Sequence, residues 1–143
     1  MSFQLHPNLA TKSPIIDLPL CSVLLEDNQY YPWIFLVPRR ENISKIMDLN
    51  SNDQLELIKE IDLAQKILWD TFKPSQLNVA AIGNKTSQLH IHVIARKSND
   101  PAWPGTVWDH GSTLPYPKEH KERMIQLLAI DFQNSLKAPS YHY

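Results

Sequence analysis

The stretch at residues 88–94, which reads Gln-Leu-His-Ile-His-Val-Ile, constrains this chain more than any other. Its alternating apolar residues predict a β-strand, in which successive side chains point to opposite faces. Gln88, His90 and His92 would then lie on one face, while the apolar residues between them enter a core. Three polar side chains on one face of such a strand contribute little to the stability of the fold, so the pattern indicates a functional site.

Length and composition narrow the class of protein. The chain has 143 residues and a formal charge of -1, so we expect a single domain over residues 1–143, long enough to bury a core, with no global basic field to recruit nucleic acid. No signal peptide and no apolar run of ~20 residues is visible, so we expect no membrane partner. The lone Cys21 fits a reducing compartment, and we expect a cytoplasmic protein.

Apolar runs separated by turn residues predict an α+β fold with an antiparallel sheet. The predicted strands cover residues 22–26, 33–37, 77–82 and 89–95. The first two would form a hairpin. Ser51 and Gln54 have capping-box spacing, and apolar residues then recur at helical spacing as far as Phe72. After an ordered loop over residues 100–117, a final amphipathic helix is predicted over about residues 117–132.

Two imidazoles on one strand face can bind a metal ion, act as a general base or attack an electrophile. A metal site would need a third ligand, for which Asp109, His110 and Glu26 are candidates that no fixed spacing selects. Attack on phosphorus would need an unprotonated nitrogen, a fixed acceptor for the other ring nitrogen, and nearby groups that neutralise phosphate charge. His90 and its neighbours have this layout.

At these residues the chain resembles the histidine-triad family of nucleotide hydrolases and transferases, whose motif is His-φ-His-φ-His-φ-φ with φ apolar. Residues 88–94 match every position except the first, where Gln88 stands in place of His. Trp33–Arg40, the long helix, the Gly83-Asn84 turn and the Trp-Pro-Gly of residues 103–105 follow the family's order. The resemblance covers roughly residues 20–110.

The resemblance implies an antiparallel sheet with one long central helix and a C-terminal helix, and a homodimer. It implies a nucleoside monophosphate substrate joined through its α-phosphate to a leaving group, as in dinucleoside polyphosphates or adenosine phosphoramidates. His90 would be the nucleophile that forms a nucleotidyl-histidine intermediate. His92 would bind the phosphate and assist the leaving group, and the main-chain carbonyl of Gln88 would orient His90. No metal or other cofactor would be required.

Further residues are candidates for substrate binding: Asn84, Lys85, Trp103 and Trp33. The resemblance is incomplete, because Gln88 and Trp33 stand where some branches of the family have histidine. The alternative is therefore a nucleotide-binding module with weak or lost catalysis.

Overall fold

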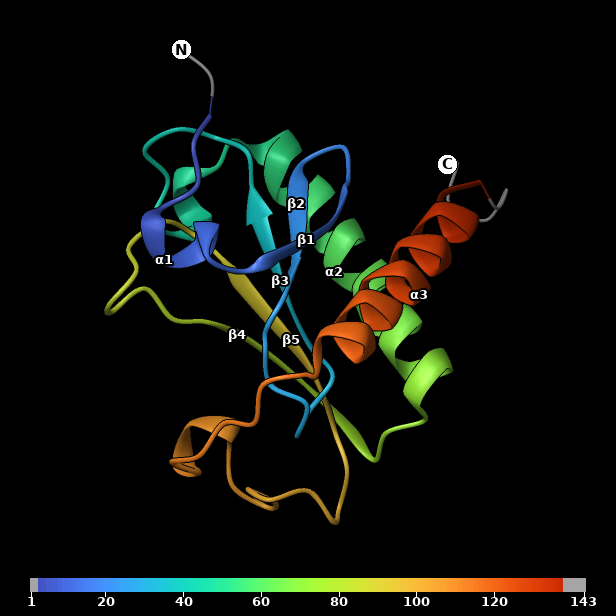
Figure 1. Ribbon diagram of the computed structural model, residues 1–143. Helices are drawn as coiled ribbons and strands as arrows, with labels where there is room; N and C mark the ends of the chain where they lie inside the picture. Colours follow the sequence, from blue (N-terminus) through green and yellow to red (C-terminus); the bar gives the residue numbers. More distant parts are fainter. Residues whose placement is uncertain (1–2, 138–143) are drawn as a thin grey trace.

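The computed structural model describes residues 3–137, so the ends of the predicted domain, residues 1–2 and 138–143, lie outside the described residues. Five antiparallel strands form one sheet in the order β1-β2-β3-β5-β4 (Figure 1). This confirms the predicted α+β fold with an antiparallel sheet. The strands are β1 (Ser13–Asp17), β2 (Cys21–Leu25), β3 (Trp33–Pro38), β4 (Gln76–Ala81) and β5 (Ile91–Arg96).

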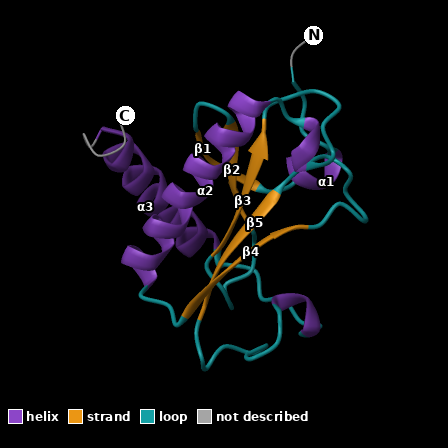
Figure 2. Cartoon of the chain, turned by 180° about the vertical axis from the view of Figure 1, so that it is seen from behind, coloured by secondary structure: helices purple, strands orange, loops and turns teal. Residues whose placement is uncertain are grey.

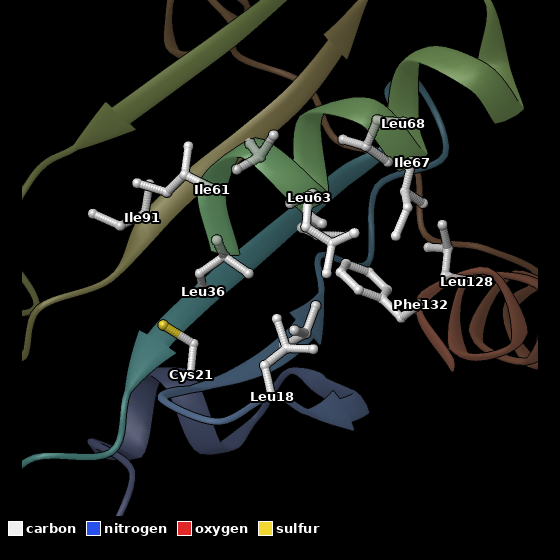
Figure 3. Close-up of a cluster of buried hydrophobic side chains, with 14 of the residues drawn as sticks. Leu18, Cys21, Leu36, Ile61, Leu63, Ile67, Leu68, Ile91, Leu128 and Phe132 are labelled. Carbon is white, nitrogen blue, oxygen red and sulfur yellow. The ribbon is translucent and has the colours of Figure 1, made fainter. Parts of the chain in front are cut away.

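Two long helices cover one face of this sheet, and a short helix lies on the other (Figure 2). The long ones are α2 (Ser51–Phe72) and α3 (Lys118–Lys137), and the short one is α1 (Pro7–Ala10). Side chains from β2, β3 and β5 meet the apolar sides of α2 and α3 in the main core (Figure 3). Leu68 of α2 and Phe132 of α3 are fully buried there. Burial of this apolar face is the main term that holds the helices to the sheet.

The opposite face of the sheet carries a second and smaller apolar cluster. Trp33 and Phe35 of β3 and Leu24 of β2 pack there against Leu9 of α1 and Val107 of the loop before α3. Because alternate residues of a strand point to opposite faces, β3 supplies Ile34 and Leu36 to the first core. It supplies Trp33, Phe35 and Val37 to the second. This second face is the one that holds His92.

Helix α2 begins one residue earlier than the capping signal suggested. The cap is Asn50, whose side-chain oxygen accepts a hydrogen bond from Asp53 N–H at 2.8 Å, so the prediction of a Ser51 cap was wrong. Gln54 donates instead to the carbonyl of Leu49 at 2.9 Å. The helix ends where Lys73 adopts a left-handed conformation with φ of 50°.

Sequence periodicity missed the first two elements, α1 and β1. Each is four or five residues long, and neither contains a sustained apolar alternation. The last helix also runs further than predicted, to Lys137. Its buried face is Met124, Leu128 and Phe132.

None of the helices formed within residues 3–137 is long and apolar enough to cross a bilayer.

Candidate active site

The two histidines of the motif lie where β5 begins, between β3 and β4. His90 precedes the strand and His92 is its second residue, paired with Phe35 of β3 and Ala80 of β4. Each histidine is only 6% exposed, and their ring centroids are 5.0 Å apart. Two imidazoles are thus held in contact on the second face of the sheet, at the start of β5.

His90 is oriented by the main chain. Its Nδ1 lies 2.7 Å from the carbonyl oxygen of Gln88. A carbonyl oxygen can only accept a hydrogen bond, so Nδ1 carries the proton and donates it. The lone pair of His90 is therefore on Nε2, and the orientation of the ring does not depend on which side chain residue 88 has.

His92 has the opposite proton placement. The indole Nε1–H of Trp33 donates to His92 Nδ1 at 3.0 Å. An indole nitrogen is a donor only, so Nδ1 must present its lone pair and the proton of the neutral ring lies on Nε2. Burial lowers the pKa of His92 to about 3, with further lowering from His90 and Lys12. His92 is therefore a neutral N–H donor.

Aromatic rings enclose His92. Phe35 and Trp108 have centroids 4.8 and 5.0 Å from the His92 ring, and Trp33 lies at 5.7 Å. The rings remove water from three sides of the imidazole, which strengthens the directed hydrogen bond from the indole.

Both histidines open on a cavity of about 660 Å³. Its floor is the second face of the sheet, and its walls come from the N-terminal segment, from the loop before β5 and from the loop before α3. Lys12 and Glu26 form an ion pair of 2.7 Å within it. The remaining lining residues are Asn8, Leu9, Trp33, Phe35, Ile82, Asn84, Lys85, Thr86 and Trp108.

Comparison with known proteins identifies the family. The HIT domain matches residues 9–99. The chain belongs to the HIT domain family. Histidine triad proteins of known structure superpose on it closely. The one from Bradyrhizobium japonicum is 37% identical, with a TM-score of 0.88 and coverage of 92% of this chain and 99% of its own. The one from Marinobacter aquaeolei VT8 is 36% identical, with a TM-score of 0.89 and coverage of 94% and 98%.

A more distant structure shares the fold alone. The diadenosine triphosphate hydrolase of Plasmodium falciparum is 16% identical, with a TM-score of 0.62 and coverage of 89% of this chain and 80% of its own. A search of curated protein sequences found no match.

In this HIT domain, most of the residues singled out from the sequence surround one cavity. Trp33, Asn84 and Lys85 line it together with His90 and His92. A second cavity of about 510 Å³ lies beyond His90 and Asn84, toward Ser44 and Lys45. His90 therefore borders free volume on two sides.

The side chain of Gln88 does not line the cavity on which the two histidines open, and it contacts the N-terminal segment instead. The strand starts at Ile91, but the alternation of faces begins earlier, because Leu89 lies in the main core with Ile91 and Val93 while His90 meets Phe35 on the second face. Gln88 Oε1 accepts from His6 N–H at 2.8 Å, and Gln88 Nε2 donates to the carbonyl of Gln4 at 2.9 Å. The glutamine amide holds the N-terminal segment, and only its main chain touches His90.

Trp103 lies outside the cavity of this chain. Its ring covers the guanidinium of Arg96, with 5.8 Å between the Arg96 Cζ and the ring centroid. Trp108, five residues later, lies edge-on to both Trp33 and His92. Sequence reasoning placed a tryptophan of this loop at the site, and the structure shows Trp108 there.

The N-terminal wall of Asn8, Leu9 and Lys12 was missed from the sequence. The only local signal is Pro7, which is favoured at the first position of a helix. Within residues 3–137, no three His, Cys, Asp or Glu side chains gather in a way that could hold a metal ion, and Asp109, His110 and Glu26 do not complete a ligand set with the two histidines.

Proposed function

We propose that this HIT protein is a hydrolase or nucleotidyl transferase that acts on nucleoside monophosphates joined through the α-phosphate to a leaving group. The candidate substrates are dinucleoside polyphosphates and adenosine phosphoramidates. Two facts support the class of substrate: membership of the HIT family, and the fold shared with a diadenosine triphosphate hydrolase. We also propose that the protein acts in the cytoplasm.

The observation that carries the proposal is the opposite proton placement on two adjacent imidazoles. His90 has a free lone pair on Nε2 and a proton on Nδ1 that the Gln88 carbonyl holds. In the neutral ring Nε2 is therefore the nitrogen that can attack phosphorus. The positive charge that develops on the ring is stabilised by the same carbonyl. His90 is the proposed nucleophile.

The surroundings of His90 suit a phosphate. His92 Nε2–H is a donor close to the nucleophile, and the amide of Asn84 and the ammonium of Lys85 line the same cavity. Donors that meet the charge developing on phosphoryl oxygens stabilise the transition state. We assign Asn84 and Lys85 to phosphate binding and Trp33 to the wall of the substrate cavity.

Hydrolysis then follows in two displacements. His90 Nε2 forms a bond to the α-phosphorus while the bond to the leaving group breaks, which gives a nucleotidyl-imidazolium. Water next attacks the phosphorus, the bond from Nε2 to phosphorus breaks, and neutral His90 returns as the nucleoside monophosphate departs. The proton lost by the attacking water passes to solvent. Splitting one displacement into two in this way is the general advantage of covalent catalysis.

A direct assay tests this proposal. Wild type and His90→Ala are incubated with diadenosine tetraphosphate and with adenosine phosphoramidate, in excess chelator, and released AMP is measured. We expect metal-independent release by the wild type and no release by the variant. Full turnover by His90→Ala would refute the role of His90. Absence of release from both substrates, together with tight AMP binding, would instead support a nucleotide-binding module with lost catalysis.

We further propose a second copy of this chain as the partner. Strand β4 lies at an edge of the sheet, and within the described residues no strand pairs with its outer side. Val79 on β4 is 44% exposed, and Leu55 and Ile58 on α2 are 64% and 63% exposed. Exposed apolar side chains and an open strand edge favour association. Sedimentation equilibrium should give twice the chain mass of 16.5 kDa, and a stable monomer at micromolar concentration would contradict this.

A further inference from the structure

Trp33 is held in one orientation by its neighbours. It is 7% exposed, stacks on Phe35 with 6.2 Å between centroids, and meets Tyr31 and Trp108 edge-on. Its position on β3 is fixed by pairing with Ile94 of β5. The indole cannot turn away from His92 without disrupting the second apolar cluster. Its N–H therefore stays directed at Nδ1 of His92.

Protonation of His92 would oppose this arrangement. An imidazolium carries a proton on both nitrogens, so its Nδ1–H would face the indole N–H and the hydrogen bond would be lost. A buried donor without a partner costs free energy. The ammonium of Lys12 acts in the same direction, because it would repel a cation on His92. The carboxylate of Glu26 does not offset this, because it is paired with Lys12.

We infer that Trp33 is a specificity-determining residue: by donating to His92 Nδ1, it makes His92 a hydrogen-bond donor that cannot act as an acid. The site then favours leaving groups that depart as anions. This inference rests on the proposed function and selects, within it, phosphoanhydrides over phosphoramidates.

A phosphoanhydride needs no acid. As His90 Nε2 bonds to the α-phosphorus, the bridging phosphorus–oxygen bond breaks, and the electron pair leaves with the departing phosphate oxygen. That oxygen is a stable anion at neutral pH, and His92 Nε2–H can hydrogen-bond to it. No proton is transferred in this step, so the fixed neutral ring is sufficient.

A phosphoramidate does need an acid. When the phosphorus–nitrogen bond breaks, the amine would leave as a strongly basic amide anion unless a proton reaches the nitrogen. His92 cannot supply one, because loss of Nε2–H from a neutral imidazole is very unfavourable. The other proton donors lining the cavity are the ammonium groups of Lys12 and Lys85, which are weak acids, and Lys12 already donates to Glu26. General acid catalysis typically contributes a hundredfold or more, and that contribution is missing here.

The test compares the two substrates on one protein. We expect kcat/KM for AMP release from diadenosine tetraphosphate to exceed that from an adenosine phosphoramidate of a primary amine by about a hundredfold. In Trp33→Phe, which keeps an aromatic ring but has no N–H, this ratio should fall by about tenfold or more. Trp33→His, whose ring can carry a proton, should lower it further.

A second readout does not depend on turnover. Nitrogen-15 NMR of the wild type should show His92 protonated on Nε2 alone from pH 5 to 8. In Trp33→Phe the single tautomer should be lost, and Nδ1–H should appear on His92 beside Nε2–H. Trp108→Phe is the matched control, since it changes an indole against the same ring without removing the hydrogen bond from Trp33 to Nδ1, and the tautomer should persist.

The outcomes distinguish failure of the role of Trp33 from failure of the proposed function. Release of AMP from both substrates at equal rates, or an Nδ1–H tautomer of His92, would overturn the role of Trp33 and leave the proposed function standing. Release from neither substrate by the wild type would overturn the proposed function itself, and the inference with it.

Discussion

His90 and His92 have the same side chain but opposite proton placement, and neighbours of two kinds set the difference. A main-chain carbonyl fixes His90, and an indole N–H fixes His92. Donor and acceptor assignments of this sort follow from chemistry that each partner cannot change: a carbonyl never donates and an indole nitrogen never accepts. Two residues apart in sequence, the rings thereby acquire separate functions.

The role of His92 as a donor predicts a graded series of variants. His92→Ala should lower kcat for AMP release by about a hundredfold, the usual effect of losing one transition-state donor. His92→Gln keeps an N–H but has no titratable group, so it should be faster than His92→Ala. Steady-state kinetics on variants of matched thermal stability would check this. If His92→Gln is as slow as His92→Ala, donation alone does not explain the residue.

At the scale of elements, the loop over residues 100–117 is attached to the sheet by one buried ion pair. Arg96, the last residue of β5, makes two hydrogen bonds to Asp100, of 2.7 and 2.9 Å, with the two side chains 2% and 5% exposed. Asp100 also accepts from the main chain of Lys97 and Trp103. This junction sets the start of the loop that carries Trp108 to His92.

We predict that Asp100→Asn lowers the free energy of unfolding by about 3 kcal/mol, because it leaves the buried Arg96 without a compensating charge. The matched control is Asp62→Asn on α2, where the partner of an exposed ion pair with Lys66 is neutralised. That change should cost at most about 0.5 kcal/mol. Urea unfolding of both variants measures the difference, and equal losses would contradict the importance of burial at Asp100.

The long elements were predictable and the short ones were not. Helix α2 and strands β2, β3, β4 and β5 carry enough apolar periodicity to be recognised, although the start of β5 was placed two residues early. Leu127 and Ile130 add to the apolar content of α3, yet their side chains are 42% and 54% exposed. Which side of an amphipathic helix is buried depends on the neighbour that it meets, and the sequence does not state this.

For the whole molecule, a buried carboxylate ties the central helix to the sheet. Glu60 of α2 is 2% exposed and accepts from the main-chain N–H groups of Leu20 and Cys21, both at 2.8 Å. It thus holds α2 at the start of β2. Burial, with a smaller contribution from Glu56, raises the pKa of Glu60 from 4.5 to about 7.

This raised pKa predicts a pH-dependent stability. Between pH 4.5 and 7 the folded state binds the Glu60 proton more tightly than the unfolded chain does, so the contribution of Glu60 to stability is lost as pH rises. Glu60→Gln does not titrate. The difference in free energy of unfolding between wild type and this variant should therefore shrink by about 2 kcal/mol from pH 4.5 to 7. The other titrating groups, His92 among them, are common to both proteins and cancel in this difference. Urea unfolding at several pH values tests this, and a constant difference would contradict it.

The site was predictable in its chemistry and only partly in its geometry. The spacing of His90 and His92 revealed the pair, and Trp33, Asn84 and Lys85 surround the same cavity. Gln88 was expected beside the histidines, and the structure shows that its amide binds the N-terminal segment instead of lining the cavity. The N-terminal wall could not be found, because Lys12 and His90 are far apart in sequence and only folding brings their segments together.

The side-chain amide of Gln88 affects ligand binding, whereas the main chain of the same residue affects reactivity. It clamps the main chain at Gln4 and His6, and this clamp positions the segment that supplies Asn8, Leu9 and Lys12 to the cavity. The nucleophile, by contrast, depends only on the backbone of residue 88. Changes in the first dozen residues can therefore reshape what the protein recognises while the reacting pair stays intact, so ligand preference can diverge between relatives that keep identical chemistry.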